Sequence, residues 1–128
     1  MANVLDLIGR IFISALFLIS AYNKIFNLEG SMNWMEGFGV PSFLIFPAIA
    51  LEIILPVLVI IGYQARLAAG ILSIFCILTA FVFHFDFSNQ SQLISFLKNI
   101  GLAGGFLFIL AHGTKEWSVD REKKYVRL

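Results

Sequence analysis

Four long apolar segments occupy most of this chain of 128 residues and constrain its fold more than any motif does. They span residues 5–22, 42–62, 67–83 and 93–112. Each is close to the roughly 20 residues that an α-helix needs to cross the hydrocarbon core of a bilayer. A helix also satisfies its own backbone hydrogen bonds there without water. The pattern predicts an all-α integral membrane protein, a bundle of four transmembrane helices.

Composition excludes a water-soluble domain. Hydrophobic residues make up 59% of the chain and charged residues only 13%, whereas soluble domains carry about 25% charged residues. A chain this short would bury only about two thirds of its surface on folding in water. The net charge of +1 offers no basic stripe, so we expect no nucleic-acid partner. The expected partner is the lipid bilayer.

Basic residues predict the orientation and the division of the chain. Residues 114–128 form a basic tail behind the last apolar segment, with Lys115, Arg121, Lys123, Lys124 and Arg127. Because basic residues near span ends favour the cytoplasmic side, we expect a cytoplasmic tail and, with four spans, both termini in the cytoplasm. The transmembrane domain is then residues 1–113. The connections 27–41 and 85–92, which have no Lys or Arg, are expected outside as loops.

Polar and small residues recur at every third or fourth position of three segments, which places them on one helical face. We expect these faces to point into the bundle, and the pair Gly101 and Gly105 suits close helix contact. The three faces consist of Asp6, Arg10, Ser14, Phe17, Ala21 and Lys24; of Arg66, Gly70, Ser73, Cys76, Ala80 and His84; and of Lys98, Gly101, Gly105, Phe108 and His112.

Glu52 is the most unusual residue, because it lies at the centre of the second apolar segment. A central acidic residue costs roughly 2.5–3.5 kcal/mol on insertion, so it must face the bundle and find a partner or a proton. Pro56 lacks the donor that would bond the backbone carbonyl of Glu52. Two interpretations stay open: Glu52 locks its helix to Arg10, or it has a functional role.

The remaining charged residues suggest one candidate polar site. Asp6 and Arg10, four residues apart, can pair with each other. Lys24, His84 and Lys98 fall near the outer helix ends, where long basic side chains can extend to the headgroups. Together with Asn23, Asp86 and Asn99 they can instead surround a polar pocket that opens outward above Glu52. The candidate ligand-binding residues are Glu52, His84, Lys98, Arg10, Lys24 and Asn99.

No metal site is expected. The chain has no H-E-x-x-H, C-x-x-C or phosphate-loop pattern, and its single cysteine, Cys76, cannot form a dithiol within one chain. His84 is expected at the outer end of the third span and His112 at the inner end of the fourth, about 30 Å apart, so they cannot ligate one haem iron together.

Several segments, in order, resemble the DoxX family from residue 8 to residue 113. IGRIFISALFLISAYNKIF resembles the first helix of the family, and FGVPSFLIFPAIALEIILPVLVIIGYQAR resembles its second. FLKNIGLAGG, preceded by a histidine, is similar to the last part. The residues that carry the resemblance are Gly9, Arg10, Ser20, Lys24, Gly39, Val40, Pro41, Glu52, Gly62, His84, Lys98, Asn99, Gly104 and Gly105. Where many relatives have a glycine, this chain has Ala21.

The resemblance implies a four-helix protein of the bacterial inner membrane. The family is named for a subunit of a thiosulfate:quinone oxidoreductase, and other members are associated with redox and oxidative-stress systems. It therefore implies an accessory or quinone-associated subunit of a redox-linked membrane complex, with a quinone as the candidate cofactor and a redox protein or a second copy as partner. In that interpretation Glu52 or His84 handles the proton of the quinone, and Lys98 or Arg10 stabilises its reduced charge.

Two other functions stay open, and so does whether the chain itself is an enzyme. The first is a non-catalytic structural or anchoring subunit, in which the charged residues serve helix assembly alone. The second is a small solute transporter, for which so short a chain would need to oligomerise.

Overall fold

The computed structural model describes residues 1–119, and the regular structure of this part is helical. The elements are α1 (Ala2–Phe26), α2 (Leu28–Gly37), the short 3-10 helix η1 (Ser42–Leu44), α3 (Ile45–Ile61), α4 (Ala65–Phe83) and α5 (Gln90–His112). Four stretches are long and apolar enough to cross a membrane: Ala2–Phe26, Ser42–Ile61, Ala65–Phe83 and Gln90–His112. The predicted all-α bundle of four transmembrane helices is confirmed.

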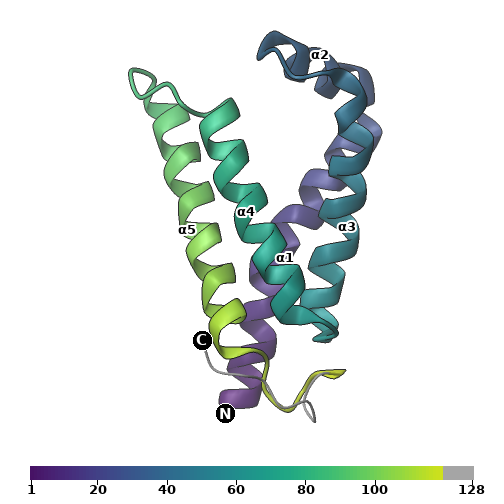
Figure 1. The fold of residues 1–128 in the computed structure, drawn as a ribbon, viewed down its shortest axis with the longest axis vertical. Helices are drawn as coiled ribbons and strands as arrows, with labels where there is room; N and C mark the ends of the chain where they lie inside the picture. Colours follow the sequence, from purple (N-terminus) through teal and green to yellow (C-terminus); the bar gives the residue numbers. More distant parts are fainter. Residues whose placement is uncertain (120–128) are drawn as a thin grey trace.

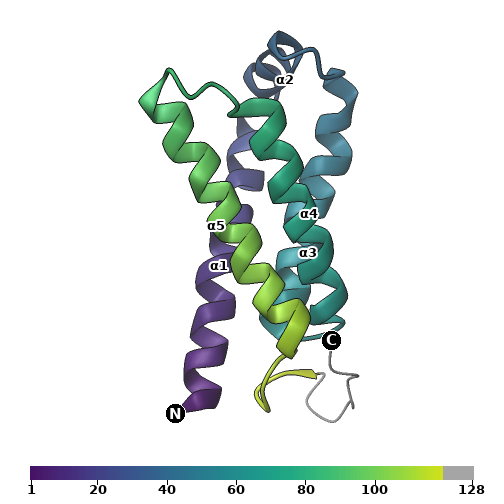
Figure 2. The same cartoon turned by 60° about the vertical axis from the view of Figure 1, so that its left-hand side comes forward.

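The four spans are arranged as two pairs. Helix α1 packs against α3, α4 packs against α5, and the contact between α3 and α4 joins the pairs. The pairs diverge toward the end that carries α2 (Figures 1 and 2). We call this the α2 end, and the opposite end, where Met1 lies, the terminal end. Which end faces the cytoplasm stays a prediction.

The apolar core lies where the pairs converge. Phe17 of α1 and Phe106 of α5 are buried with ring centroids 5.6 Å apart, and Val59 and Leu72 pack in the same cluster. The hydroxyl of Ser73 donates to the backbone carbonyl of a buried alanine of α5 over 3.2 Å. The predicted inward faces of α1 and α4 are confirmed at their centres by buried Arg10, Ser14, Phe17, Ala21, Ser73, Cys76 and Ala80.

The predicted inward face of α5 is confirmed at Gly105, where an added Cβ would lie 2.6 Å from the Ile13 side chain of α1, and is wrong at its other positions. Phe108 is 69% exposed, and Lys98, Gly101 and His112 are exposed as well. The face that packs against the bundle instead centres on Ala103 and Phe106. A Cβ at Gly101 would meet nothing within 4 Å. Neighbouring positions on a helix differ by about 100° in direction, so a stripe chosen by its lysine and glycines missed the apolar face beside it.

Helix α2 corrects the expectation of a plain loop over residues 27–41. Leu28, Met32 and Met35 recur at helical spacing and face inward, with Met35 buried, whereas Glu29 and Glu36 are exposed. The segment is thus a short amphipathic helix. The spacing of its apolar residues indicates this helix, whereas the lack of basic residues bears only on which side of the membrane the segment lies.

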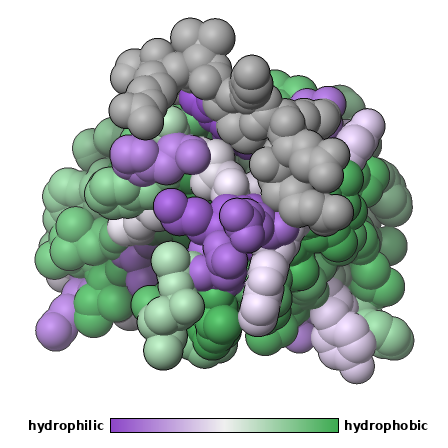
Figure 3. All heavy atoms as spheres, turned by 90° about the horizontal axis from the view of Figure 1, so that it is seen from below, coloured by the Kyte–Doolittle hydropathy of each residue, from purple (hydrophilic) through white to green (hydrophobic). Residues whose placement is uncertain are grey.

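Arg10 organises the terminal end of the bundle. Its Nε donates to Asp6 Oδ2 over 3.0 Å, which confirms the predicted pair. Its Nη1 donates to the backbone carbonyls of Val59 (3.1 Å) and Ile60 (2.6 Å), and its Nη2 to that of Trp117 (2.7 Å). Polar residues accordingly gather at the middle of this end, within an apolar periphery (Figure 3). The arginine therefore ties α1, α3 and the segment after α5 together.

The chain after α5 folds back onto this end. The backbone N–H of Lys115 donates to Asp6 Oδ2 over 3.1 Å, and Ser118 is buried. The basic residues Arg121, Lys123, Lys124 and Arg127 lie outside the described residues. The division of the chain into 1–113 and 114–128 stays a prediction.

Gly62 ends α3 in the left-handed region, with φ 75°. A Cβ at this position would collide with the Cβ of Ser118 and lie 3.2 Å from Arg10 Nη1. Both the turn and the docking of the segment after α5 therefore require a glycine here.

We expect Gly62→Ala to destabilise the protein by about 1–2 kcal/mol from the left-handed conformation alone, and by more because of the collision with Ser118. Gly101→Ala is the matched control. It adds a methyl group in open space within a helix and should be neutral or stabilising by up to about 1 kcal/mol. Thermal unfolding in one detergent compares the two variants. Equal melting temperatures would contradict the packing described at the terminal end.

Candidate functional site

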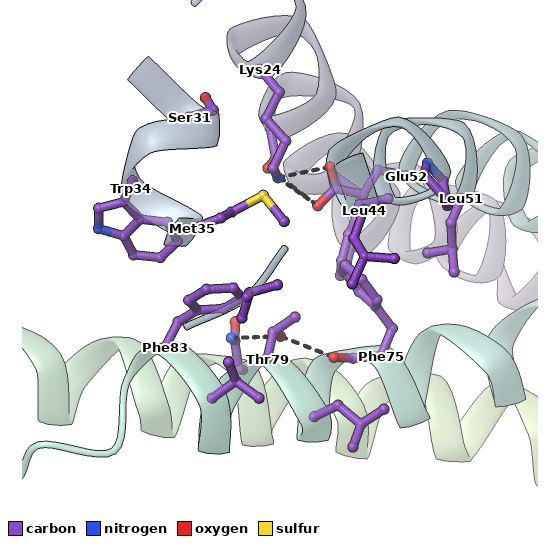
Figure 4. Close-up of a pocket in the computed structure, with 18 of the residues that line it drawn as sticks. Lys24, Ser31, Trp34, Met35, Leu44, Leu51, Glu52, Phe75, Thr79 and Phe83 are labelled. Carbon is purple, nitrogen blue, oxygen red and sulfur yellow. Dashed lines mark hydrogen bonds and ion pairs between the residues drawn. The ribbon is translucent and has the colours of Figure 1, made fainter. Parts of the chain in front are cut away.

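A cavity of about 820 Å³ lies between the diverging helix pairs, beneath α2. Its walls come from every helix, and most of its lining is apolar, with Leu51 of α3 and Phe75 of α4 on facing sides (Figure 4). The volume falls within the roughly 300–1,000 Å³ of small-molecule sites. The cavity is the candidate site.

An ion pair forms the polar part of the wall made by α1 and α3. Lys24 Nζ donates to both carboxylate oxygens of Glu52 over 2.9 Å and to Ser20 Oγ over 2.9 Å. Glu52 is only 3% exposed, so its carboxylate depends on this ammonium for compensation. All three donors of the ammonium are engaged, which makes the pair a closed, neutral unit.

The partner of Glu52 is therefore Lys24, and the expectation of Arg10 is wrong. Helices α1 and α3 pack antiparallel, and Arg10 lies level with Val59. Glu52 precedes Val59 by seven residues, about 10 Å along the helix axis, which is beyond the reach of Arg10. The expectation that Lys24 extends outward to the lipid headgroups is wrong as well, because its side chain turns inward to the Glu52 carboxylate.

Asn99 of α5 and Thr79 of α4 supply polar groups on the facing wall. Asn99 Nδ2 donates to Thr79 Oγ1 over 3.3 Å, and this hydroxyl donates to the carbonyl of Phe75 over 2.9 Å. A carboxamide carries two donor hydrogens and an acceptor oxygen. Asn99 thus has hydrogen-bonding capacity beyond its bond to Thr79.

Aromatic residues and a methionine of α2 cover the α2 end of the cavity. Trp34 stacks on Phe83 of α4 with centroids 4.6 Å apart, and Phe38 meets the Trp34 ring edge-on at 4.9 Å. Met35 extends from α2 into the cavity, on the side of the Lys24–Glu52 pair (Figure 4). Sequence reasoning missed Trp34 and Met35 because it took this segment for a loop.

His84 lies at the rim of the cavity, directly after α4. Its Nδ1 is 2.7 Å from Gln92 Oε1. The donor and acceptor roles in this hydrogen bond depend on the tautomer of the imidazole ring. His84 therefore places a ring with two hydrogen-bonding nitrogens at the rim of the cavity.

The structure brings four of the six candidate residues together. Glu52, Lys24, His84 and Asn99 line the cavity, whereas Arg10 lies at the terminal end and Lys98 is exposed on α5. Of the other residues expected around the pocket, Asn23 lines an adjoining groove, and the carboxylate of the exposed Asp86 accepts hydrogen bonds from Ser88.

This arrangement suits an uncharged, amphipathic molecule. The charges of Lys24 and Glu52 compensate each other, so the cavity presents no unpaired charge from this wall. Aromatic side chains provide flat apolar contacts, and polar groups lie on facing walls. Such a site can hold a ring system that carries hydrogen-bonding groups on opposite sides.

Comparison with known proteins gives consistent matches. The DoxX family matches residues 5–85, which include Lys24, Glu52 and His84 but not Asn99. Inner membrane protein YqjF of Escherichia coli (strain K12) is 34% identical over 115 residues, 90% of this chain and 88% of that protein. Inner membrane protein YphA of the same strain is 29% identical over 125 residues, 92% of this chain and 89% of that protein. No solved structure matches the chain.

We expect Lys24→Met to destabilise the protein by about 3 kcal/mol, because it leaves the buried Glu52 carboxylate without its partner. Glu52→Gln should cost less, since the Lys24 side chain is 26% exposed and can extend toward water. The double variant Lys24→Met/Glu52→Gln should lose less unfolding free energy than the two single variants lose together, by at least about 1 kcal/mol. Thermal unfolding measures this cycle.

Lys98→Met is the control for loss of a basic residue, because Lys98 is exposed and makes no ion pair among the described residues. Its stability should remain close to that of the native chain. Strictly additive effects of Lys24→Met and Glu52→Gln would show that the ion pair does not hold α1 to α3.

Proposed function

The chain belongs to the DoxX family and is a multi-pass inner-membrane protein, and from this premise we propose that it binds a quinone in the cavity as an accessory subunit of a redox-linked membrane complex. The observation that carries the proposal is the lining of the cavity, which is mostly apolar and carries hydrogen-bonding groups on two facing walls, Lys24 and Glu52 on one and Asn99 on the other.

The chemistry of a quinone fits these walls. Its ring has two apolar faces and two carbonyl oxygens on opposite edges, each of which accepts hydrogen bonds. Asn99 can donate to one carbonyl, and Lys24 or Ser20 can donate to the other by exchanging a bond of the Lys24–Ser20–Glu52 cluster. Phe75 and Phe83 lie beside the space that the ring would occupy.

Reduction of a quinone to a quinol takes up two electrons and two protons. Glu52 and His84 are the cavity residues that can relay these protons: each takes up a proton from water and passes it to one of the two oxygens. Lys24 replaces Lys98 and Arg10 in the expected role of stabilising reduced-quinone charge, because Lys24 alone of these three lines the cavity. The electrons come from, or pass to, a redox centre in a partner protein.

Intrinsic fluorescence tests this proposal. The chain has two tryptophans, and Trp117→Phe leaves Trp34, which lines the cavity, as the single reporter. We expect a short-chain benzoquinone or naphthoquinone to quench Trp34 saturably. Asn99→Leu should weaken binding about tenfold, since a lost hydrogen bond in a buried site costs roughly 1–3 kcal/mol.

Lys98→Met provides the matched control, because it changes the neighbouring residue on the exposed side of the same helix. It should bind the quinone with native affinity. Linear, non-saturable quenching that is equal in all variants would contradict quinone binding and favour a structural or anchoring subunit.

A further inference from the structure

A groove of about 510 Å³ adjoins the cavity along α1 and the start of α2. The residues that line both spaces are Leu16, Ser20, Lys24, Asn27 and Ser31. The groove and the cavity therefore adjoin each other along these five residues. Ile19, Asn23 and Phe26 line the groove without lining the cavity.

Polarity changes along the groove. Toward the middle of α1 it is apolar, and Ile19 is 59% exposed on the surface that faces lipid. Toward the α2 end it is polar, with Asn23, Asn27 and Ser31. The side chains of these three residues have no hydrogen-bond partner among residues 1–119. The groove is therefore suited to an amphipathic molecule whose apolar part lies at the lipid-facing end and whose polar part lies beside the cavity.

We propose that this groove is the lateral access route of the ligand and holds its hydrophobic tail, so that the ligand is a quinone with a long aliphatic tail. This inference rests on the function proposed above. The headgroup occupies the cavity beyond Lys24 and Ser20, and the tail runs back along Leu16 and Ile19 to the lipid. The ligand reaches the site without leaving the bilayer.

Two physical arguments favour this route over access from water. A long tail that lies in the groove keeps its contact with lipid, so binding does not require burying it within the protein or exposing it to water. The headgroup carbonyls, which lose hydrogen bonds on leaving the interface, can bond to Asn23, Asn27 and Ser31 on the way.

The experiment uses the full chain in nanodiscs and two radiolabelled benzoquinones with the same headgroup, one tailless and one with a long prenyl tail. Ile19→Trp fills the groove outside the cavity. Ile74→Trp is the matched control, since Ile74 on α4 is 60% exposed, like Ile19, but lines neither space. We expect Ile19→Trp to weaken binding of the tailed quinone about tenfold, with unchanged binding of the tailless one, and Ile74→Trp to change neither.

Native binding of the tailless quinone to Ile19→Trp also shows that this variant is folded. Equal effects of Ile19→Trp and Ile74→Trp on the tailed quinone would overturn the access route while leaving the proposed function standing. Failure of the native chain to bind either quinone would overturn both.

A photoreactive label gives a second test without any substitution. A quinone that carries a diazirine on its tail should, on irradiation of the native protein, label residues 16–26 of α1, as located by mass spectrometry. Labelling confined to α4 and α5 would overturn the proposed position of the tail.

Discussion

The ion pair between Lys24 and Glu52 holds α1 to α3 in the half of the bundle where the two helix pairs diverge. A carboxylate at this depth is stable only with a compensating charge, so α1 must present Lys24 to α3 at this level. The register of these two helices then places Arg10 against the end of α3. The cavity exists because the ion pair fixes one wall while α4 and α5 diverge from it.

Arg10 has the corresponding role at the terminal end. It donates to Asp6 and to three backbone carbonyls from two separate parts of the chain. The carbonyls of the last turn of α3 lack partners within their own helix, and the guanidinium supplies donors to two of them. Arg10 therefore joins α1, α3 and the segment after α5 at the terminal end, whereas the cavity lies toward the α2 end.

Helix α2 covers the cavity at the α2 end. It contributes Trp34 and Met35 to the lining, and the stacking of Trp34 on Phe83 connects the α1–α3 pair to α4 across the opening. The groove along α1 adjoins this site at Leu16, Ser20 and Lys24. An aromatic cover together with a mostly apolar lining suits a hydrophobic ligand better than one dissolved in water.

The sequence by itself determined the all-α membrane fold, the four spans and the isolation of Glu52 in an apolar segment, because the length and hydropathy of a segment decide whether it can cross a bilayer. The three- and four-residue spacing of polar and small residues also predicted the buried faces of α1 and α4, and the same spacing predicted the Asp6–Arg10 pair. Only the tertiary structure decided that Lys24, rather than Arg10, compensates Glu52, and that Asn99 rather than Lys98 faces the cavity. Those outcomes depend on the axial register of the antiparallel helices and on the rotation of each helix about its axis. Side-chain packing between helices sets both, and the periodicity within one helix does not.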